Sequence, residues 1–232
     1  MAIQTVRWHL YPDAEALRAK AVAVIGRAAA EALARGGGFH LALAGGTTPR
    51  AVYQALRGTA ARWDQWHVWF GDERCLPPRD AERNSHMASS AWLGHVPVAA
   101  GNIHAIPAEL GAERGAAAYA EALRQAPEFD LVLLGLGEDG HTASLFPGHP
   151  WGGEPGSPDA LAVHDAPKPP AARISLSARR LSRTRQVLFL VNGESKREAV
   201  RRWREGAEIP AAAIAPEGGV DVLVDSAAFG GY

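Results

Sequence analysis

The stretch Leu131-Val132-Leu133-Leu134-Gly135-Leu136-Gly137-Glu138-Asp139-Gly140-His141 decides the fold class of this protein. It begins with a continuous apolar run that is too short for a helix and lacks the alternation of a half-exposed strand. Continuous runs of this kind are typical of strands that are buried on both faces of a parallel sheet. A glycine-rich loop with two acids and a histidine follows directly. The stretch therefore predicts a buried strand whose carboxyl end opens into a polar loop.

Similar apolar runs recur along the chain, and segments of helical character lie between them. The other runs cover residues 39–44, 68–70, 187–191 and 220–224. The expected helices cover residues 13–35, 49–56, 84–93, 113–125 and 194–203, the first capped by Asp13 and stopped by the glycines at 36–38. This alternation predicts an α/β fold, a doubly wound, mostly parallel sheet with helices on both faces. With 232 residues, we expect one domain spanning 1–232.

Composition excludes several classes of function. The 24 Lys and Arg residues balance 25 Asp and Glu residues, so no global field favours binding of nucleic acid or of an anionic membrane. The single cysteine, Cys75, excludes an intramolecular disulfide and a cysteine-based zinc cluster. The N-terminal stretch has no signal-peptide core, and no run reaches the ~18 apolar residues of a membrane span. We expect a cytoplasmic protein that acts as a monomer, with a weak dimer as the alternative.

The loop after the run at 39–44 has the features of a phosphate site. Gly45, Gly46, Thr47 and Thr48 lead into Pro49, which suits the first turn of a helix. Free backbone N–H groups, two hydroxyls and a positive helix end favour an anion. The lysine of a Walker A loop is absent. The alternative is a plain glycine turn with Thr48 as the helix cap.

The loop after the run at 68–70 concentrates charge. Asp72, Glu73 and Arg74 follow the strand directly, and two prolines end the loop. A solvated charge cluster is the alternative to a functional site. Cys75 beside Arg74 suggests either a low-pKa thiol or, as we favour, a small buried residue.

The third loop presents Asp139 and His141 at the end of the strand at 131–134. Its glycines match G-x-G-x-x-G, but Pro147 cuts short the long helix that a dinucleotide site needs. A carboxylate and an imidazole two residues apart suit general-base catalysis. A capping or core histidine is the alternative, and a metal site lacks compact ligand spacing with His149 or His164. The Gly- and Pro-rich segment 148–170 is the one long irregular stretch and is interpreted as an active-site flap.

These three loops closely resemble those of the 6-phosphogluconolactonases. The matching stretches are 45–49, 71–75 with Asn84-Ser85, and 137–148, and the resemblance extends from the first helix to Lys196. The third motif is highly specific, whereas the first is shared with the glucosamine-6-phosphate deaminases. The resemblance implies a Rossmann-like sheet, a sugar 6-phosphate ligand, and hydrolysis of 6-phosphoglucono-1,5-lactone without a cofactor or a metal.

The family pattern also implies roles at the reacting end of the site. It makes His141 the general base that activates water, with Asp72 and Arg74 lining the lactone end. Arg74 is our candidate for stabilising the charge that develops on the carbonyl oxygen. Either Asp139 or Asp72 is expected to fix the tautomer of the imidazole.

At the phosphate end, the pattern implies that Thr47 and Thr48 bind together with the backbone of Gly45 and Gly46. Arg173 and Lys196 match the cationic phosphate ligands of the wider superfamily. A phosphate dianion needs such a local cation in a chain of net charge -1. The alternative for either cation is a surface charge.

Two other functions stay open at this point. A glucosamine-6-phosphate deaminase typically has a neutral residue in place of Arg74 and Asn-Glu in place of Leu145-Phe146, and both departures favour the lactonase. A sugar-phosphate-sensing domain of a transcription regulator is the non-enzymatic alternative. Such regulators normally carry a helix-turn-helix, whereas only about 38 residues precede the expected first strand of the sheet, with no basic recognition helix.

Overall fold

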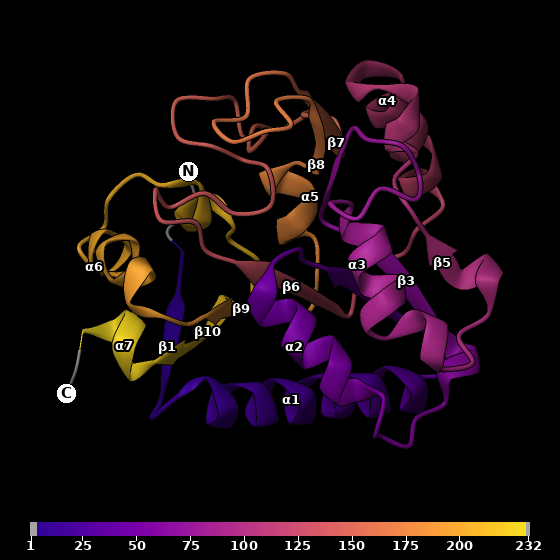
Figure 1. The fold of residues 1–232 in the computed structure, drawn as a ribbon, viewed down its shortest axis with the longest axis horizontal. Helices are drawn as coiled ribbons and strands as arrows, with labels where there is room; N and C mark the ends of the chain where they lie inside the picture. Colours follow the sequence, from indigo (N-terminus) through magenta and orange to yellow (C-terminus); the bar gives the residue numbers. More distant parts are fainter. Residues whose placement is uncertain (1–3, 231–232) are drawn as a thin grey trace.

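The computed structural model describes residues 4–230, which form a seven-stranded parallel sheet with helices on both faces (Figure 1). In spatial order the strands are β1 (Val6–Tyr11), β10 (Val220–Asp225), β9 (Val187–Val191), β6 (Leu131–Gly135), β2 (Phe39–Leu43), β3 (Trp66–Phe70) and β5 (Ile103–His104). Neighbouring strands all pair in parallel. The predicted α/β fold class is confirmed.

The helices include the five expected from the sequence, which begin and end close to the predicted positions, and two short ones, at residues 178–182 and 226–229, that were not expected. They are α1 (Ala14–Ala34), α2 (Thr47–Leu56), α3 (Asn84–Ala91), α4 (Ala112–Arg124), α5 (Ala178–Ser182), α6 (Arg197–Arg204) and α7 (Ser226–Phe229). Short 3-10 turns cover η1 (Trp63–Gln65), η2 (Leu93–His95), η3 (Ala100–Asn102), η4 (Ala108–Leu110), η5 (Glu194–Lys196) and η6 (Pro210–Ala213). Asp13 caps α1, since its carboxylate accepts a hydrogen bond from Ala16 N at 2.8 Å.

Two expectations about the strands are wrong. The main sheet begins at β1, not at residue 39, because Val6–Tyr11 is an edge strand with alternating polar residues that pairs with β10. The segment 148–170 is not wholly irregular, since it contains β7 (Ala160–Val163). This strand joins β8 (Arg173–Leu176) and β4 (Asp72–Arg74) in a second, antiparallel sheet. Within this sheet, β4 obtains its hydrogen bonds from a strand far along the chain, so local pattern does not predict the pairing.

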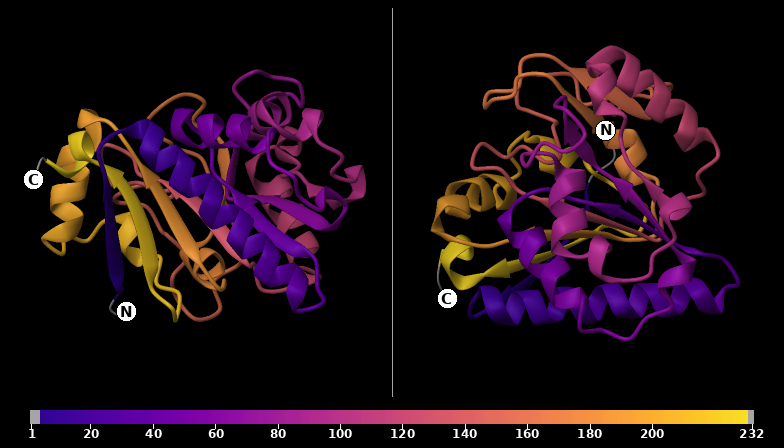
Figure 2. Two further views of the ribbon diagram at one scale, coloured as in Figure 1. Left: turned by 90° about the horizontal axis from the view of Figure 1, so that it is seen from below. Right: turned by 45° about the vertical axis from the view of Figure 1, so that its right-hand side comes forward.

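The two sheets and the helices form layers. In Figure 1 α1 runs along one side of the main sheet, and the small sheet lies with α4 and α5 on the other side. Figure 2 shows the same separation from two further directions. The strands β6, β9 and β10 in the middle of the main sheet are lined with buried apolar side chains. Among residues 4–230, no helix combines the length and the apolar character needed to cross a bilayer.

The strand order reverses between β2 and β6. From β2 the chain adds β3 and β5 on one side, and it then adds β6, β9 and β10 on the other side. Ligands of doubly wound folds bind outside the carboxyl ends of the strands at such a switch point. The topology therefore points to the loops after β2 and β6.

Candidate active site

A narrow polar cleft of about 200 Å³ lies at this switch point. Its walls come from the loops after β2, β3 and β6, from the small sheet, and from η5. The lining includes seven of the residues predicted from the sequence, namely Gly45, Gly46, Asp72, Arg74, His141, Arg173 and Lys196. Asp139, Thr47 and Thr48 are not part of this lining. The fold thus gathers residues from positions 45 to 196 into one site.

Hydrogen bonds within the loop that carries His141 fix the position of its imidazole. Its Nδ1 donates to Asp139 Oδ1 at 2.6 Å, and the same oxygen accepts the backbone N–H of His141 at 3.0 Å. The loop closes on itself through Gly137 N, which donates to His141 O at 2.7 Å. A Cβ on Gly137 would lie 2.0 Å from His141 Nδ1, so only glycine fits beneath the ring. With Nδ1 bound to Asp139, the lone pair of Nε2 is available to accept a proton.

Asp139 is the acid that contacts the imidazole, which answers a question that the sequence left open. Burial disfavours its ionised form, but the hydrogen bonds and the charge of His141 outweigh this and lower the pKa of Asp139. Asp139 therefore stays ionised near neutral pH and fixes the tautomer of His141. His141 itself is 30% exposed, so water can reach it.

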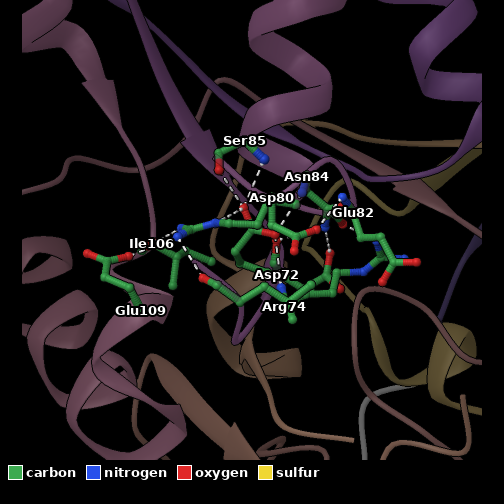
Figure 3. Close-up of polar contacts among 11 residues, drawn as sticks. Asp72, Arg74, Asp80, Glu82, Asn84, Ser85, Ile106 and Glu109 are labelled. Atoms are coloured by element: carbon green, nitrogen blue, oxygen red, sulfur yellow. Dashed lines mark hydrogen bonds and ion pairs between the residues drawn. The ribbon is translucent and has the colours of Figure 1, made fainter. Parts of the chain in front are cut away.

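Asp72 has a different environment (Figure 3). One carboxylate oxygen accepts Asn84 Nδ2 at 2.9 Å, and the other accepts Ser144 Oγ at 2.6 Å. Burial raises the pKa of Asp72, against the effects of Ser144, Arg74 and Arg173. Sequence analysis assigned no role to Asn84 or Ser144. Both residues stood within matched motifs, but their contacts with Asp72 became assignable only from the packing of the loops after β3 and β6.

The acids of the loop after β3 are buried, so the alternative of a solvated charge cluster is wrong. Glu73 is fully buried and accepts hydrogen bonds from the backbone N–H groups of Arg74, Asn84 and Ser85. It thereby fixes the start of α3 against β4. Cys75 is a half-buried free thiol whose pKa is raised by burial, so the low-pKa alternative is also wrong.

Two arginines lie side by side on neighbouring strands of the small sheet and line the cleft. Arg74 and Arg173 are register partners in β4 and β8. Arg74 donates through Nη1 to Glu82 O, while its Nε is buried and has no hydrogen-bond partner among the described residues (Figure 3). Arg173 is 7% exposed and donates to Pro170 O at 3.1 Å and Lys168 O at 2.8 Å. Burial lowers the pKa of Arg173, and the alternative of a surface charge is wrong for this residue.

The part of the cleft at the start of α2 has the features of an anion site. Gly46 occupies the N-cap position of α2 with a φ of 105°, a conformation that favours glycine, so the alternative of Thr48 as the cap is wrong. The Thr48 hydroxyl instead donates to Asn192 Oδ1, and Thr47 is exposed. Lys196, half-buried in η5, reaches the same cleft from the loop after β9. Backbone N–H groups, a helix N-terminus and a lysine therefore converge here.

The chemistry of the donors does not favour a metal. Within residues 4–230, no three His, Cys, Asp or Glu side chains converge in a way that could hold an ion. The cleft combines cations and one oriented imidazole, a set suited to a phosphorylated organic ligand.

Proteins of the doubly wound α/β class place small-molecule sites at this edge, and the cations of this cleft suit an anionic ligand. Comparison with known sequences specifies the family. The profile of glucosamine-6-phosphate isomerases and 6-phosphogluconolactonases matches residues 12–223, and the chain belongs to this family. The resemblance read from the three loops is thereby confirmed.

Individual relatives agree with this assignment. A 6-phosphogluconolactonase of Streptomyces coelicolor is 38% identical over 240 residues, covering 94% of this chain and 92% of the relative. The GDH/6PGL endoplasmic bifunctional protein of Oryctolagus cuniculus is 39% identical over 226 residues, which cover 90% of this chain but 28% of that protein. The structure of the 6-phosphogluconolactonase from Thermotoga maritima matches with a TM-score of 0.88 at 25% identity, covering 95% of this chain and 100% of the other. A monomeric glucosamine-6-phosphate deaminase shares the fold, with a TM-score of 0.84 at 20% identity over 96% of this chain and 98% of the deaminase.

Proposed function

We propose that this chain hydrolyses 6-phospho-D-glucono-1,5-lactone to 6-phospho-D-gluconate, a reaction of the oxidative branch of the pentose phosphate pathway. The full-length lactonase relatives support the activity, and the cleft supplies groups for both ends of the substrate. The observation that carries the mechanism is the 2.6 Å contact of Asp139 with His141 Nδ1, which directs Nε2 to act as a base.

The reaction begins with a water molecule between His141 Nε2 and the lactone carbonyl carbon. His141 takes one proton of the water as the oxygen attacks, and Asp139 stabilises the imidazolium that forms. Negative charge develops on the carbonyl oxygen, where the guanidinium of Arg74 stabilises it, and Asp72 helps to orient the reacting end. The bond between the carbonyl carbon and the ring oxygen then breaks. The proton on His141 passes to the ring oxygen, which becomes the hydroxyl of the product.

The phosphate of the substrate binds in the part of the cleft beside the start of α2. Its dianion is held by Arg173 and Lys196 together with the Gly45-Gly46 backbone. Thr47 and Thr48 contribute through their backbone N–H groups at the start of α2, because the Thr48 hydroxyl is committed to Asn192. Binding the phosphate fixes the distance from the anion site to His141 and thereby positions the carbonyl.

The decisive experiment offers freshly prepared lactone to the purified protein and follows proton release. Acceleration over the buffer rate is expected, and its absence overturns the proposal. A parallel assay with glucosamine 6-phosphate tests the deaminase alternative, for which ammonia release is the signature. We expect none, since Leu145 and Phe146 are buried apolar residues where the deaminases typically have a polar pair.

The setting of the reaction is also a proposal. Water is the second substrate, so hydrolysis needs no redox or group-transfer cofactor. A cytoplasmic location is supported by the free thiol of Cys75, which a reducing compartment permits. We propose a monomer, the state expected from the sequence, and sedimentation equilibrium measures the mass directly.

A further inference from the structure

The burial of Phe146 does not result from packing within the apolar core. The side chain is 3% exposed, yet it lies outside the contiguous cluster of buried apolar side chains among the described residues. Its neighbour Leu145 belongs to that cluster. A large aromatic ring that packs outside the core contributes to something other than sheet-to-helix packing.

The neighbours of the ring are the polar groups of the site. Its centroid lies 5.0 Å from that of the His141 imidazole and 5.7 Å from the guanidinium carbon of Arg173. His149 packs edge-on at 6.0 Å. The ring therefore packs against both the proposed base and one proposed phosphate ligand.

Hydrogen bonds also fix the backbone of Phe146. Its carbonyl oxygen accepts Trp151 Nε1 at 2.7 Å and His149 N at 3.2 Å, which closes the chain after the loop into a compact turn. The ring consequently has a fixed position relative to the loop that carries His141. Arg173 is in turn held by hydrogen bonds to the carbonyls of Pro170 and Lys168.

We infer that Phe146 is a positioning residue that sets the spacing between His141 and Arg173, so that a lactone whose phosphate reaches Arg173 presents its carbonyl to the base. The inference rests on the proposed function. A cation is attracted to the face of an aromatic ring, and this contact limits the positions that the guanidinium adopts. The same ring limits rotation of the imidazole about its hydrogen bond to Asp139. Phe146 thus acts through two other residues and makes no bond with the substrate.

The test is a double-mutant cycle of Phe146→Leu with Arg173→Ala, measured with phosphorylated and unphosphorylated gluconolactone. In the wild-type background, Phe146→Leu should raise KM for the phosphorylated lactone about two- to fivefold without changing KM for the unphosphorylated one. In the Arg173→Ala background this rise should vanish, because the group through which the ring acts is gone. The kcat for both substrates should fall about tenfold through the displaced imidazole.

Controls separate positioning from folding. Phe39→Leu removes a ring that is fully buried in the apolar core, and it should lower Tm without changing either KM. Phe146→Tyr keeps the ring and should restore the wild-type KM. If Phe146→Leu does not fold, Phe146→Met supplies a flexible side chain of similar volume for the same cycle.

The outcomes are distinct. An equal KM rise in both backgrounds, or an equal rise for both substrates, overturns the inference, as does wild-type behaviour of Phe146→Leu. The same double-mutant cycle can be measured as Kd values for 6-phosphogluconate by calorimetry, and this measurement requires no turnover. A protein that does not hydrolyse the lactone but shows the coupling in Kd would overturn the proposed function and leave only the coupling of Phe146 to Arg173.

Discussion

His141 is the residue on which the proposed reaction depends most. Its Nδ1 is bound to Asp139 at 2.6 Å, so one nitrogen of the ring is left for catalysis. We predict that His141→Ala lowers kcat ~10²–10⁴-fold with little change in KM, since loss of a general base acts on the transition state. Steady-state kinetics by proton release measure both parameters. His164→Ala is the control, because this imidazole is exposed and pairs with Glu113; equal losses in both variants would remove His141 from the mechanism.

Arg74 offers a second prediction for a single residue. Its buried Nε lacks a partner among the described residues, and an arginine in that position is suited to contact a ligand oxygen. Arg74→Met should lower kcat about 10²-fold, because it keeps the apolar stem but removes all N–H donors. A rise in KM at constant kcat would show instead that Arg74 binds the ground state. If both parameters stay unchanged, the oxyanion must be stabilised elsewhere, and the backbone N–H groups of residues 137–141 are the next candidates.

The loop after β6 acts as one structural element, and Gly137 is its tightest point. A methyl group there would meet His141 Nδ1 at 2.0 Å, so the imidazole would have to move. Gly137→Ala should therefore reduce kcat at least tenfold in a folded protein. Circular dichroism and kinetics test this together. Gly101→Ala is the matched control, since a Cβ at that position meets no atom within 4 Å; a fully active Gly137→Ala would show that the loop tolerates displacement of the ring.

The small sheet is the element that brings the two arginines together. Pairing of β4 with β8 places Arg74 opposite Arg173, although 99 positions separate them in the sequence, as the register pairs residue 74 with residue 173. The residues themselves were identifiable by their place in the motifs. Their adjacency was not, because pairing of short strands depends on contacts with the rest of the fold.

The whole molecule carries a pH-dependent feature at the amino edge of the main sheet. His40, His67 and His104 stack in a column, with centroids 4.4 Å and 5.8 Å apart in succession, and Trp69 Nε1 donates to His40 Nδ1. Burial lowers the pKa of His40 to about 4, aided by the neighbouring His67, His104 and Arg180 against the opposing charge of Asp130. Burial also lowers the pKa values of His67 and His104.

These shifts predict the direction of acid destabilisation. Since the folded-state pKa of His40 lies below its unfolded value, the unfolded chain binds more protons between pH values of about 6.5 and 4. The contribution of His40 to the free energy of unfolding is therefore fully present above about pH 6.5. It falls as the pH decreases, by roughly 2 kcal/mol after allowance for solvent screening. Urea unfolding at about pH 7.5 and about pH 5 measures this. His40→Gln should flatten the dependence, and an unchanged slope would contradict the assignment.

The sequence by itself determined the class of sheet, the residues of the three loops and the family. Continuous apolar runs such as 131–134 and 187–191 can be satisfied only in the interior of a parallel sheet, and the residues after them must then emerge at one edge. These are local consequences of side-chain polarity and chain direction. They required no knowledge of which strand lies beside which.

The tertiary structure alone decided the partners within the site. It assigned the imidazole to Asp139 and not to Asp72, bound Asp72 to Asn84 and Ser144, and buried Glu73. It also revealed β1 as the edge strand and placed β7 within the segment that looked irregular. Each of these features depends on contacts between residues far apart in the chain or on the exact course of a loop. Local sequence patterns do not contain such contacts, because burial and hydrogen-bond partners are fixed only when the chain has packed.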